Sequence, residues 1–147
     1  LYTDVLGRPA DPDGRAYWVG RIRAGLSLQQ LGVNFYGSAE YVAGSGSTDG
    51  YVRRLYQAIL HRQADPGGLA YWTGRLTGAG ARPADVANGF YQSVESRTDR
   101  VSDLYQLVLG RGADTAGLAF WVDQLLRSDD VALAADLASS DEFLLRG

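Results

Sequence analysis

The 147-residue chain contains no cysteine, no methionine and no lysine, and His61 is its only histidine. The absence of cysteine excludes disulfide bonds, a thiol nucleophile and a thiolate metal site. All 14 basic residues are arginines, and with 17 acidic residues the net charge is -3, which argues against a nucleic-acid partner. No apolar run approaches the roughly 18 residues that span a bilayer, so we expect no membrane insertion. Hydrophobic residues make up 46% of the chain, which is typical of a globular protein able to bury its own core.

What the sequence does contain is a threefold internal repeat. Residues 1–18, 55–72 and 104–121 align without gaps, and a shared block beginning at a serine ends each unit. Self-similarity at a spacing of roughly 50 residues is typical of helical repeat proteins. We therefore predict repeats 1–48, 49–97 and 98–147, packed together as one compact domain. The part of the first helix that precedes residues 55 and 104 has no counterpart before Leu1, so we expect the chain to be a fragment of a larger protein.

Each repeat is predicted to form helices only. Apolar residues at Tyr51, Leu55, Tyr56 and Ile59 recur with the 3.6-residue period of an α-helix. This first helix should end where a left-handed residue can close it, at the position held by Gly7, His61 and Gly110. Two further helical segments follow in each unit, and the predicted fold class is all-α.

Recurring polar residues mark the helix starts. An aspartate begins the second helix of each repeat, and two of the three are followed by proline, which is favoured at the first helical position. A serine with an acidic residue two positions later begins a short helix in the shared block. Ser27, with Gln30 three residues on, forms a capping-box pattern. The predicted structural caps are Asp11, Asp65, Asp114, Ser38, Ser93 and Ser140.

Patterns that could carry catalysis or bind metal are weak. Asp11-Pro12-Asp13-Gly14 resembles the start of a calcium loop, but the other two copies lack its second carboxylate and no glutamate follows at the required spacing. His61 replaces a glycine of the other copies, and no nucleophile elbow accompanies it. Glu40, Glu95 and Glu142 recur once per repeat, which favours a capping role over glycosidase chemistry. No phosphate-binding glycine loop occurs, and we predict no catalytic residue, no metal and no cofactor.

The aromatic residues leave two interpretations open. The repeated pairs Tyr17-Trp18, Tyr71-Trp72 and Phe120-Trp121 could stack on sugar rings, or one member of each pair could fill the core. Adjacent helical residues point about 100° apart, so one can be buried while the other reaches the rim. We predict the core position for Trp18, Trp72 and Trp121, and a ligand-binding surface formed by Tyr17, Tyr71, Tyr36, Tyr91 and Arg15, with Tyr41 and Tyr51 as further exposed candidates.

Taken together, these residues resemble a known family. The pattern Leu-Tyr-x-x-Val-Leu-Gly-Arg-x-x-Asp-x-x-Gly-Leu-Ala-Tyr-Trp, followed by Ser-x-Glu and an aromatic residue, resembles the domain of unknown function DUF4214 in three copies over essentially the whole chain. It is also similar to the linker repeats of phycobilisomes. The departures are His61 for glycine, Arg15 for leucine, Thr115 for proline and Ser96 for the aromatic residue.

The resemblance implies a helical module of large bacterial secreted or cell-surface proteins, often beside calcium-binding repeats, adhesion modules or S-layer regions, with no catalytic residues to carry over. We therefore expect a non-catalytic interaction or scaffold module that is extracellular or at the cell surface and binds a protein partner. The alternative is a carbohydrate-binding module that contacts a cell-surface glycan through tyrosine or tryptophan platforms with aspartate and arginine.

Overall fold

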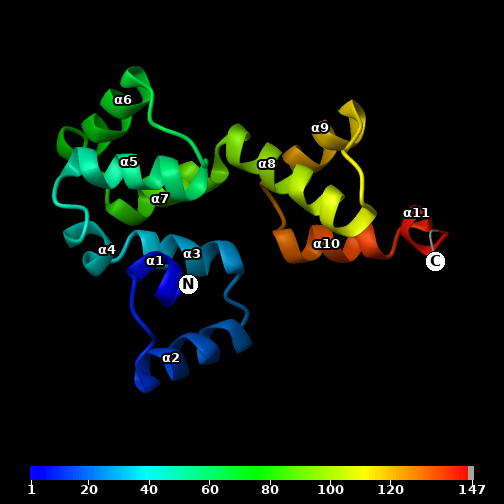
Figure 1. The fold of residues 1–147 in the computed structure, drawn as a ribbon, viewed down its shortest axis with the longest axis horizontal. Coiled ribbons are helices and arrows are strands. Elements are labelled where there is room, and N and C mark those ends of the chain that lie inside the picture. The colour runs from blue at the N-terminus through cyan, green and yellow to red at the C-terminus, as the bar shows by residue number, and fades with distance from the viewer. Residues whose placement is uncertain (146–147) are drawn as a thin grey trace. The chain divides into compact units, whose positions relative to one another are not determined.

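A computed structural model describes residues 1–145 of the chain, and every regular element in this part is helical (Figure 1). The all-α fold predicted from the repeats is therefore confirmed. The elements are α1 (Tyr2–Leu6), α2 (Pro12–Arg23), α3 (Leu28–Tyr36), α4 (Ala39–Ala43), α5 (Thr48–Ile59), α6 (Pro66–Thr77), α7 (Pro83–Gln92), α8 (Val94–Leu104), the π-helix η1 (Tyr105–Leu109), α9 (Thr115–Gln124), α10 (Asp130–Ala138) and α11 (Asp141–Leu144).

The first helix of each repeat is followed by a left-handed residue, as the sequence predicts. A residue with a positive φ follows it in all three copies: Gly7 at 69° and Gly110 at 63° directly after the helix, and His61 at 54° one residue further on. His61 is the only non-glycine residue with a positive φ among residues 1–145. A histidine in this region is strained relative to glycine, because its Cβ crowds the backbone.

The second helix of each repeat starts at an aspartate whose carboxylate caps it. Asp11 accepts a hydrogen bond from the amide of Gly14 at 2.7 Å, and the same bond recurs between Asp65 and Gly68 at 2.8 Å. The third copy, from the Gly117 amide to Asp114, measures 2.9 Å. Each bond satisfies an amide that the first helical turn leaves unpaired.

Glycine at the third position of these helices has a packing reason. A Cβ built on Gly14, Gly68 or Gly117 would lie less than 3.0 Å from a tyrosine hydroxyl of the same repeat's first helix. The three hydroxyls belong to Tyr2, Tyr56 and Tyr105. The tyrosine therefore packs against the start of the second helix in each copy, and only glycine leaves room for it.

The shared serines cap the start of the last helix of each repeat. Ser38, Ser93 and Ser140 each accept a hydrogen bond from the amide three residues later. After the first of these helices, α4, the chain turns through Gly44 to Ser47, with Gly46 at a φ of 75°. After Ser93 no such glycine follows, and α8 continues into η1 as the first helix of the third repeat.

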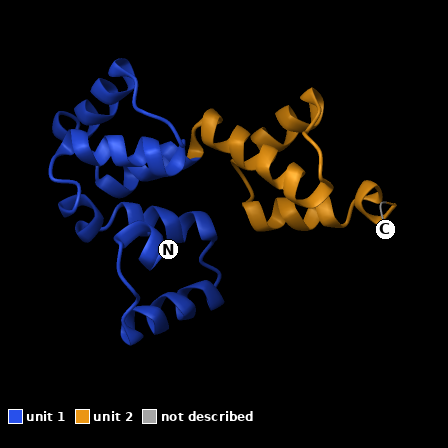
Figure 2. Cartoon of the chain, in the orientation of Figure 1, with its two compact units in different colours: residues 1–91 blue, residues 92–147 orange. Residues whose placement is uncertain are grey.

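The chain divides into two compact units, Leu1–Tyr91 and Gln92–Gly147, of which the second is described to residue 145 (Figure 2). The boundary between the two units lies shortly before the predicted start of the third repeat. The first two repeats share one core, whereas the third has its own. The core of the first unit contains Val5, Leu31, Phe35, Tyr36, Tyr41, Tyr51, Val52, Leu55, Tyr56, Ile59, Leu60, Val86, Ala87 and Phe90, and that of the second contains Val101, Tyr105, Leu109, Leu125, Leu133 and Leu137.

Candidate interaction surfaces

An arginine after the first helix ties the parts of each repeat together. In the first repeat, Arg8 forms a bidentate ion pair with Glu40 at 2.6 and 2.9 Å, and its guanidinium carbon lies 5.2 Å from the centre of the Tyr2 ring. In the third repeat, Arg111 pairs with Glu142 in the same way, at 2.5 and 2.6 Å. Each arginine thus joins the loop after the first helix to the start of the last helix, α4 or α11.

The middle repeat uses the same arginine position. Arg62 lies 4.9 Å from the Tyr56 ring centre and 3.3 Å from a carboxylate oxygen of Asp65. The pKa of Asp65 is lowered, first by the hydrogen bond from the Gly68 amide and then by Arg62. The pKa of Glu40 is lowered by its hydrogen bonds from Arg8. These recurring charged residues therefore perform a structural task within each repeat.

The aromatic pair of the second helix is oriented alike in every copy. The rings of Tyr17 and Trp18 meet edge to face at 5.0 Å, as do those of Tyr71 and Trp72 at 5.0 Å. In the third copy, Phe120 takes the position of the tyrosine, at 4.9 Å from its tryptophan. Each tryptophan is half-buried against the core of its unit, whereas the outer ring remains in solvent.

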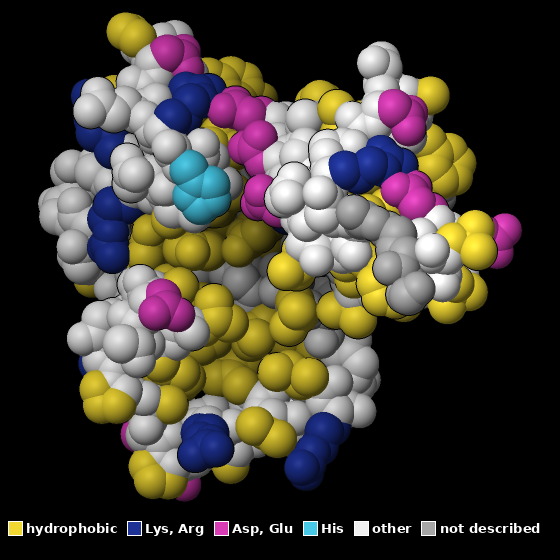
Figure 3. All heavy atoms as spheres, turned by 45° about the vertical axis from the view of Figure 1, so that its right-hand side comes forward, with side chains coloured by type: hydrophobic (Ala, Val, Ile, Leu, Met, Phe, Trp, Pro, Cys, Tyr) yellow, Lys and Arg dark blue, Asp and Glu magenta, His cyan; other side chains and the backbone are white. Residues whose placement is uncertain are grey.

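The outer rings are equally exposed in the three repeats. Tyr17 and Tyr71 are both 58% exposed and Phe120 is 54% exposed. Trp18 and Trp72 pack on Phe35 and Phe90 at ring distances of 5.1 and 4.9 Å. Of the two orientations that the sequence allowed, the structure places tryptophan inward and the neighbouring aromatic ring outward. Hydrophobic side chains are visible over much of the face drawn in Figure 3.

The structure corrects the expected exposed surface at three tyrosines. Tyr36, Tyr41 and Tyr51 are only 9%, 3% and 1% exposed. They lie in the shared core of the first two repeats, where the Tyr51 hydroxyl donates a hydrogen bond to the Pro83 carbonyl at 2.9 Å. Burial raises the pKa of all three hydroxyls. Tyr91 is half-buried beside Tyr36, so neither residue presents an open platform to a ligand.

Arg15 is exposed on α2. It borders a shallow depression of about 460 Å³ together with Ala10, Pro12, Ala16 and Val19. Arg15 and Tyr17 share this helix, but Tyr17 does not line the depression.

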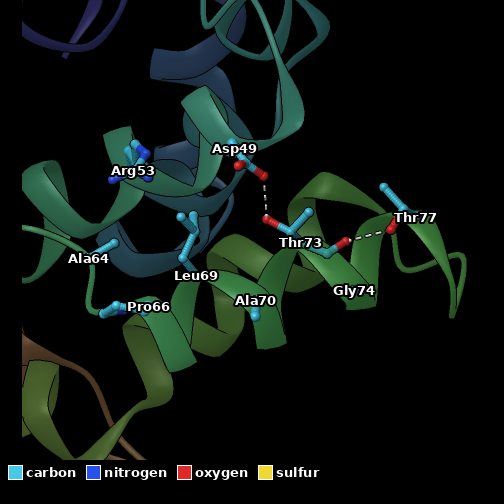
Figure 4. A pocket seen from close by; sticks show the side chains of 9 residues that line it. All are labelled: Asp49, Arg53, Ala64, Pro66, Leu69, Ala70, Thr73, Gly74 and Thr77. Carbon is cyan, nitrogen blue, oxygen red and sulfur yellow. Dashed lines mark hydrogen bonds between the residues drawn. The ribbon is translucent and has the colours of Figure 1, made fainter.

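A larger groove lies between α5 and α6 (Figure 4). It has a volume of about 500 Å³. The Thr73 hydroxyl and the Asp49 carboxylate are 3.0 Å apart at its edge, and Arg53 lies on the same side as Asp49. The remaining lining residues are Ala64, Pro66, Leu69, Ala70, Gly74 and Thr77.

The sequence interpretation did not identify this groove, although the repeats contain a signal for it. Thr73 and Thr77 of the middle copy correspond to Val122 and Leu126 of the third. Two hydroxyls thus stand where another copy of the same fold has apolar side chains. The fold does not require these hydroxyls, which makes them candidates for contact with a ligand.

The described residues show no metal cluster. Among residues 1–145, no group of three or more histidine, cysteine, aspartate or glutamate side chains is placed to hold a metal ion. His61 is exposed at the end of α5, and Glu40 and Glu142 are engaged by arginines in separate units. In the same part of the chain, no helix combines the length and the apolar character needed to cross a membrane.

Comparison with known proteins agrees with the repeat pattern. The family model described as domain of unknown function DUF4214 matches residues 1–45, 34–100 and 95–146. Neither a curated protein nor a solved structure matches the chain. Because the three matches together extend over nearly all residues, the chain belongs to the DUF4214 family and contains three copies of its domain.

Proposed function

We propose that the chain is a non-catalytic helical interaction and scaffold module of a large bacterial secreted or cell-surface protein, and that it binds a protein partner. The observation that carries this proposal is the exposed aromatic ring at one position of every repeat, Tyr17, Tyr71 and Phe120. Aromatic residues are enriched in protein interfaces, because a large rigid ring loses little conformational entropy on binding.

The neighbouring glycines strengthen this proposal. Gly20 and Gly74 lie three residues after Tyr17 and Tyr71, inside helices, and a Cβ on either would meet no atom within 4 Å. Glycine inside a helix costs about 1 kcal/mol relative to alanine. Neither packing nor a positive φ requires these glycines, but their bare backbone lets a partner approach the tyrosine ring closely.

Site-specific photo-crosslinking tests the proposal. A photoreactive phenylalanine analogue is placed at Tyr17, Tyr71 or Phe120, and, as a matched control, at Leu28, which is also exposed, at 54%. The expected result is one discrete protein adduct shared by the three aromatic positions and absent at Leu28. Equal labelling at all four positions, or no adduct at any of them, refutes a protein partner at this surface.

A specific observation favours a second candidate, carbohydrate binding at the groove between α5 and α6. Asp49 and Thr73 supply hydrogen-bonding groups at its edge. Gly74 lines the groove and lies three residues after Tyr71, on a neighbouring part of the α6 surface. A glycan array tests this candidate, with Thr73→Val as the variant because the third repeat carries valine there. Binding that is lost in Thr73→Val supports the sugar site, and an array without signal at millimolar sugar excludes it.

A further inference from the structure

The first two repeats associate through equivalent helices, α3 and α7. At one end, a Cβ on Gly37 would lie less than 3.0 Å from the backbone of Ala84. At the other, a Cβ on Gly32 would lie 2.5 Å from the Tyr91 hydroxyl. From Gly32 to Gly37 along the first chain segment, the neighbouring residue of the second thus changes from Tyr91 back to Ala84, so α3 and α7 are antiparallel.

This association has the character of a two-fold interface. Tyr36 and Tyr91 occupy the same position in their repeats, and their rings lie 6.1 Å apart. Asp4 and Ala58, also equivalent, line one hollow together with Tyr36. Contact between equivalent residues is the mark of an isologous interface, in which a surface is complementary to itself.

The third repeat contains the same surface, and within its own unit no second repeat is present to pair with it. Leu107 is 80% exposed, at the position of the exposed Asp4 and the half-buried Ala58, and Ala134 is half-buried at the position where Gly32 and Ala87 are buried. Val131, at the position of Ala84, is 56% exposed. These two positions mark the same face of the third repeat, on η1 and α10.

The third residue after the shared serine also differs in exposure between the repeats. Phe143 occupies the position of Tyr41, which is buried in the first unit. In the third repeat this ring is 40% exposed. Tyr41 packs against Tyr51 and Arg54 of α5, the helix that follows it in the first unit.

The side chains on this face of the third repeat differ in size from those of the first two repeats, and none of them is charged. Ala138 replaces the large ring of Tyr36 or Tyr91, while Leu107 replaces the small side chain of Ala58 at the adjoining position. The larger leucine thus partly offsets the volume that is lost with the tyrosine ring. The face positions Leu107, Val131, Ala134, Ala135 and Ala138 carry no charge, so two such faces would not repel each other.

We propose that this face of the third repeat, which we call the α10 face (Leu107, Val131, Ala134, Ala135 and Ala138), binds the α10 face of a second copy of the chain, with the two α10 helices antiparallel. The result is a two-fold symmetric dimer whose interface reproduces between chains the association of α3 with α7 within one chain. This proposal concerns a different surface from the exposed aromatic rings and does not depend on the proposed function.

Sedimentation of the 147-residue protein over a range of concentrations tests the dimer. We expect a reversible monomer–dimer equilibrium with no larger species. Leu107→Asp should weaken it by roughly 100-fold, since each of two leucines loses the tenfold or more that its burial supplies. Leu126→Asp is the matched control, because it makes the same substitution at a leucine that is 49% exposed and whose counterparts Arg23 and Thr77 remain exposed where the first two repeats pair. It should leave the equilibrium unchanged.

Cysteine crosslinking tests the geometry without disrupting the face. The chain has no cysteine, so Ala135→Cys introduces a single thiol at the position of Asn88, in the middle of the equivalent helix pair. A short bifunctional maleimide should link two copies of this variant efficiently and link Leu126→Cys poorly. A helical melting curve confirms that each variant remains folded.

Three results would overturn the proposal. A protein that remains monomeric at every concentration shows that the α10 face serves another repeat or another protein. Open-ended growth into larger species shows a contact that is not two-fold. A dimer that survives Leu107→Asp, with no preferential crosslinking at Ala135→Cys, shows association through a different surface.

Discussion

Two glycine substitutions on one helix test the packing of the repeat. Gly68 and Gly74 both lie in α6, and alanine has the higher helix propensity by about 1 kcal/mol. A Cβ at Gly74 meets no atom within 4 Å, so Gly74→Ala should raise the free energy of unfolding by about 1 kcal/mol. A Cβ at Gly68 would overlap the hydroxyl of Tyr56, which is only 4% exposed and cannot turn away into solvent.

Gly68→Ala should therefore destabilise the protein. Overpacking of a closely packed site costs about 1–3 kcal/mol, which exceeds the gain in helix propensity. Because both variants gain the same helix propensity, they should differ by the overpacking cost, about 1–3 kcal/mol, in urea unfolding followed by circular dichroism and tryptophan fluorescence. If the two units unfold separately, the transition of the first unit should carry the change, since α6 belongs to it.

A double substitution isolates the cause. Tyr56→Phe removes the hydroxyl that the new Cβ would meet, so Gly68→Ala should cost less in that background than in the original protein. The coupling free energy between the two substitutions should be about 1 kcal/mol or more. Equal effects of Gly68→Ala and Gly74→Ala, or no coupling to Tyr56→Phe, would refute the packing argument.

Three further outcomes are expected. His61→Gly should stabilise the protein by about 0.5–1 kcal/mol in urea unfolding, because relief of the positive φ exceeds the added entropy of the unfolded chain; a loss of stability would contradict this. The pKa of Asp65 is lowered from 3.8 by folding, so its contribution to stability is present above that value and is lost as the pH falls through the lower folded pKa. Acid titration of Asp65→Asn should show a smaller fall in stability than the original protein over that range, and identical curves would refute the assignment. Trp72→Ala should cost about 3 kcal/mol through lost packing, whereas Tyr71→Ser should change thermal stability by less than about 0.5 kcal/mol; comparable losses would show that the outer ring is structural.

Local features of the fold could be predicted from the sequence. Asp11, Asp65 and Asp114 cap helices through a bond that spans only three residues, so spacing along the chain is sufficient to identify them. The left-handed residue at His61 could also be predicted, because two glycines occupy its equivalent positions. Each local conformation can thus be inferred from three equivalent stretches of sequence.

The candidate surfaces were only partly predictable. Tyr17 and Tyr71 were identified as candidates, but Tyr36 was placed on the same surface although it is buried. Tyrosine is compatible with both settings, since its ring is apolar and its hydroxyl is polar. Its burial depends on a helix of the neighbouring repeat, and the sequence pattern of a single repeat does not contain that contact.

The three repeats, the helical class, the helix caps and the position of the aromatic pair follow from the amino-acid sequence, because each depends on residues within one helix or one turn of it. Which repeats share a core depends on contacts between helices that are far apart along the chain. Gly44 and Gly46 interrupt the helix between the first two repeats, which lets α3 and α7 fold back against each other. After Ser93 the helix continues without such a break, and the third repeat buries a core of its own. The groove beside Thr73 depends on the packing of α5 against α6, which brings together side chains that no local pattern relates.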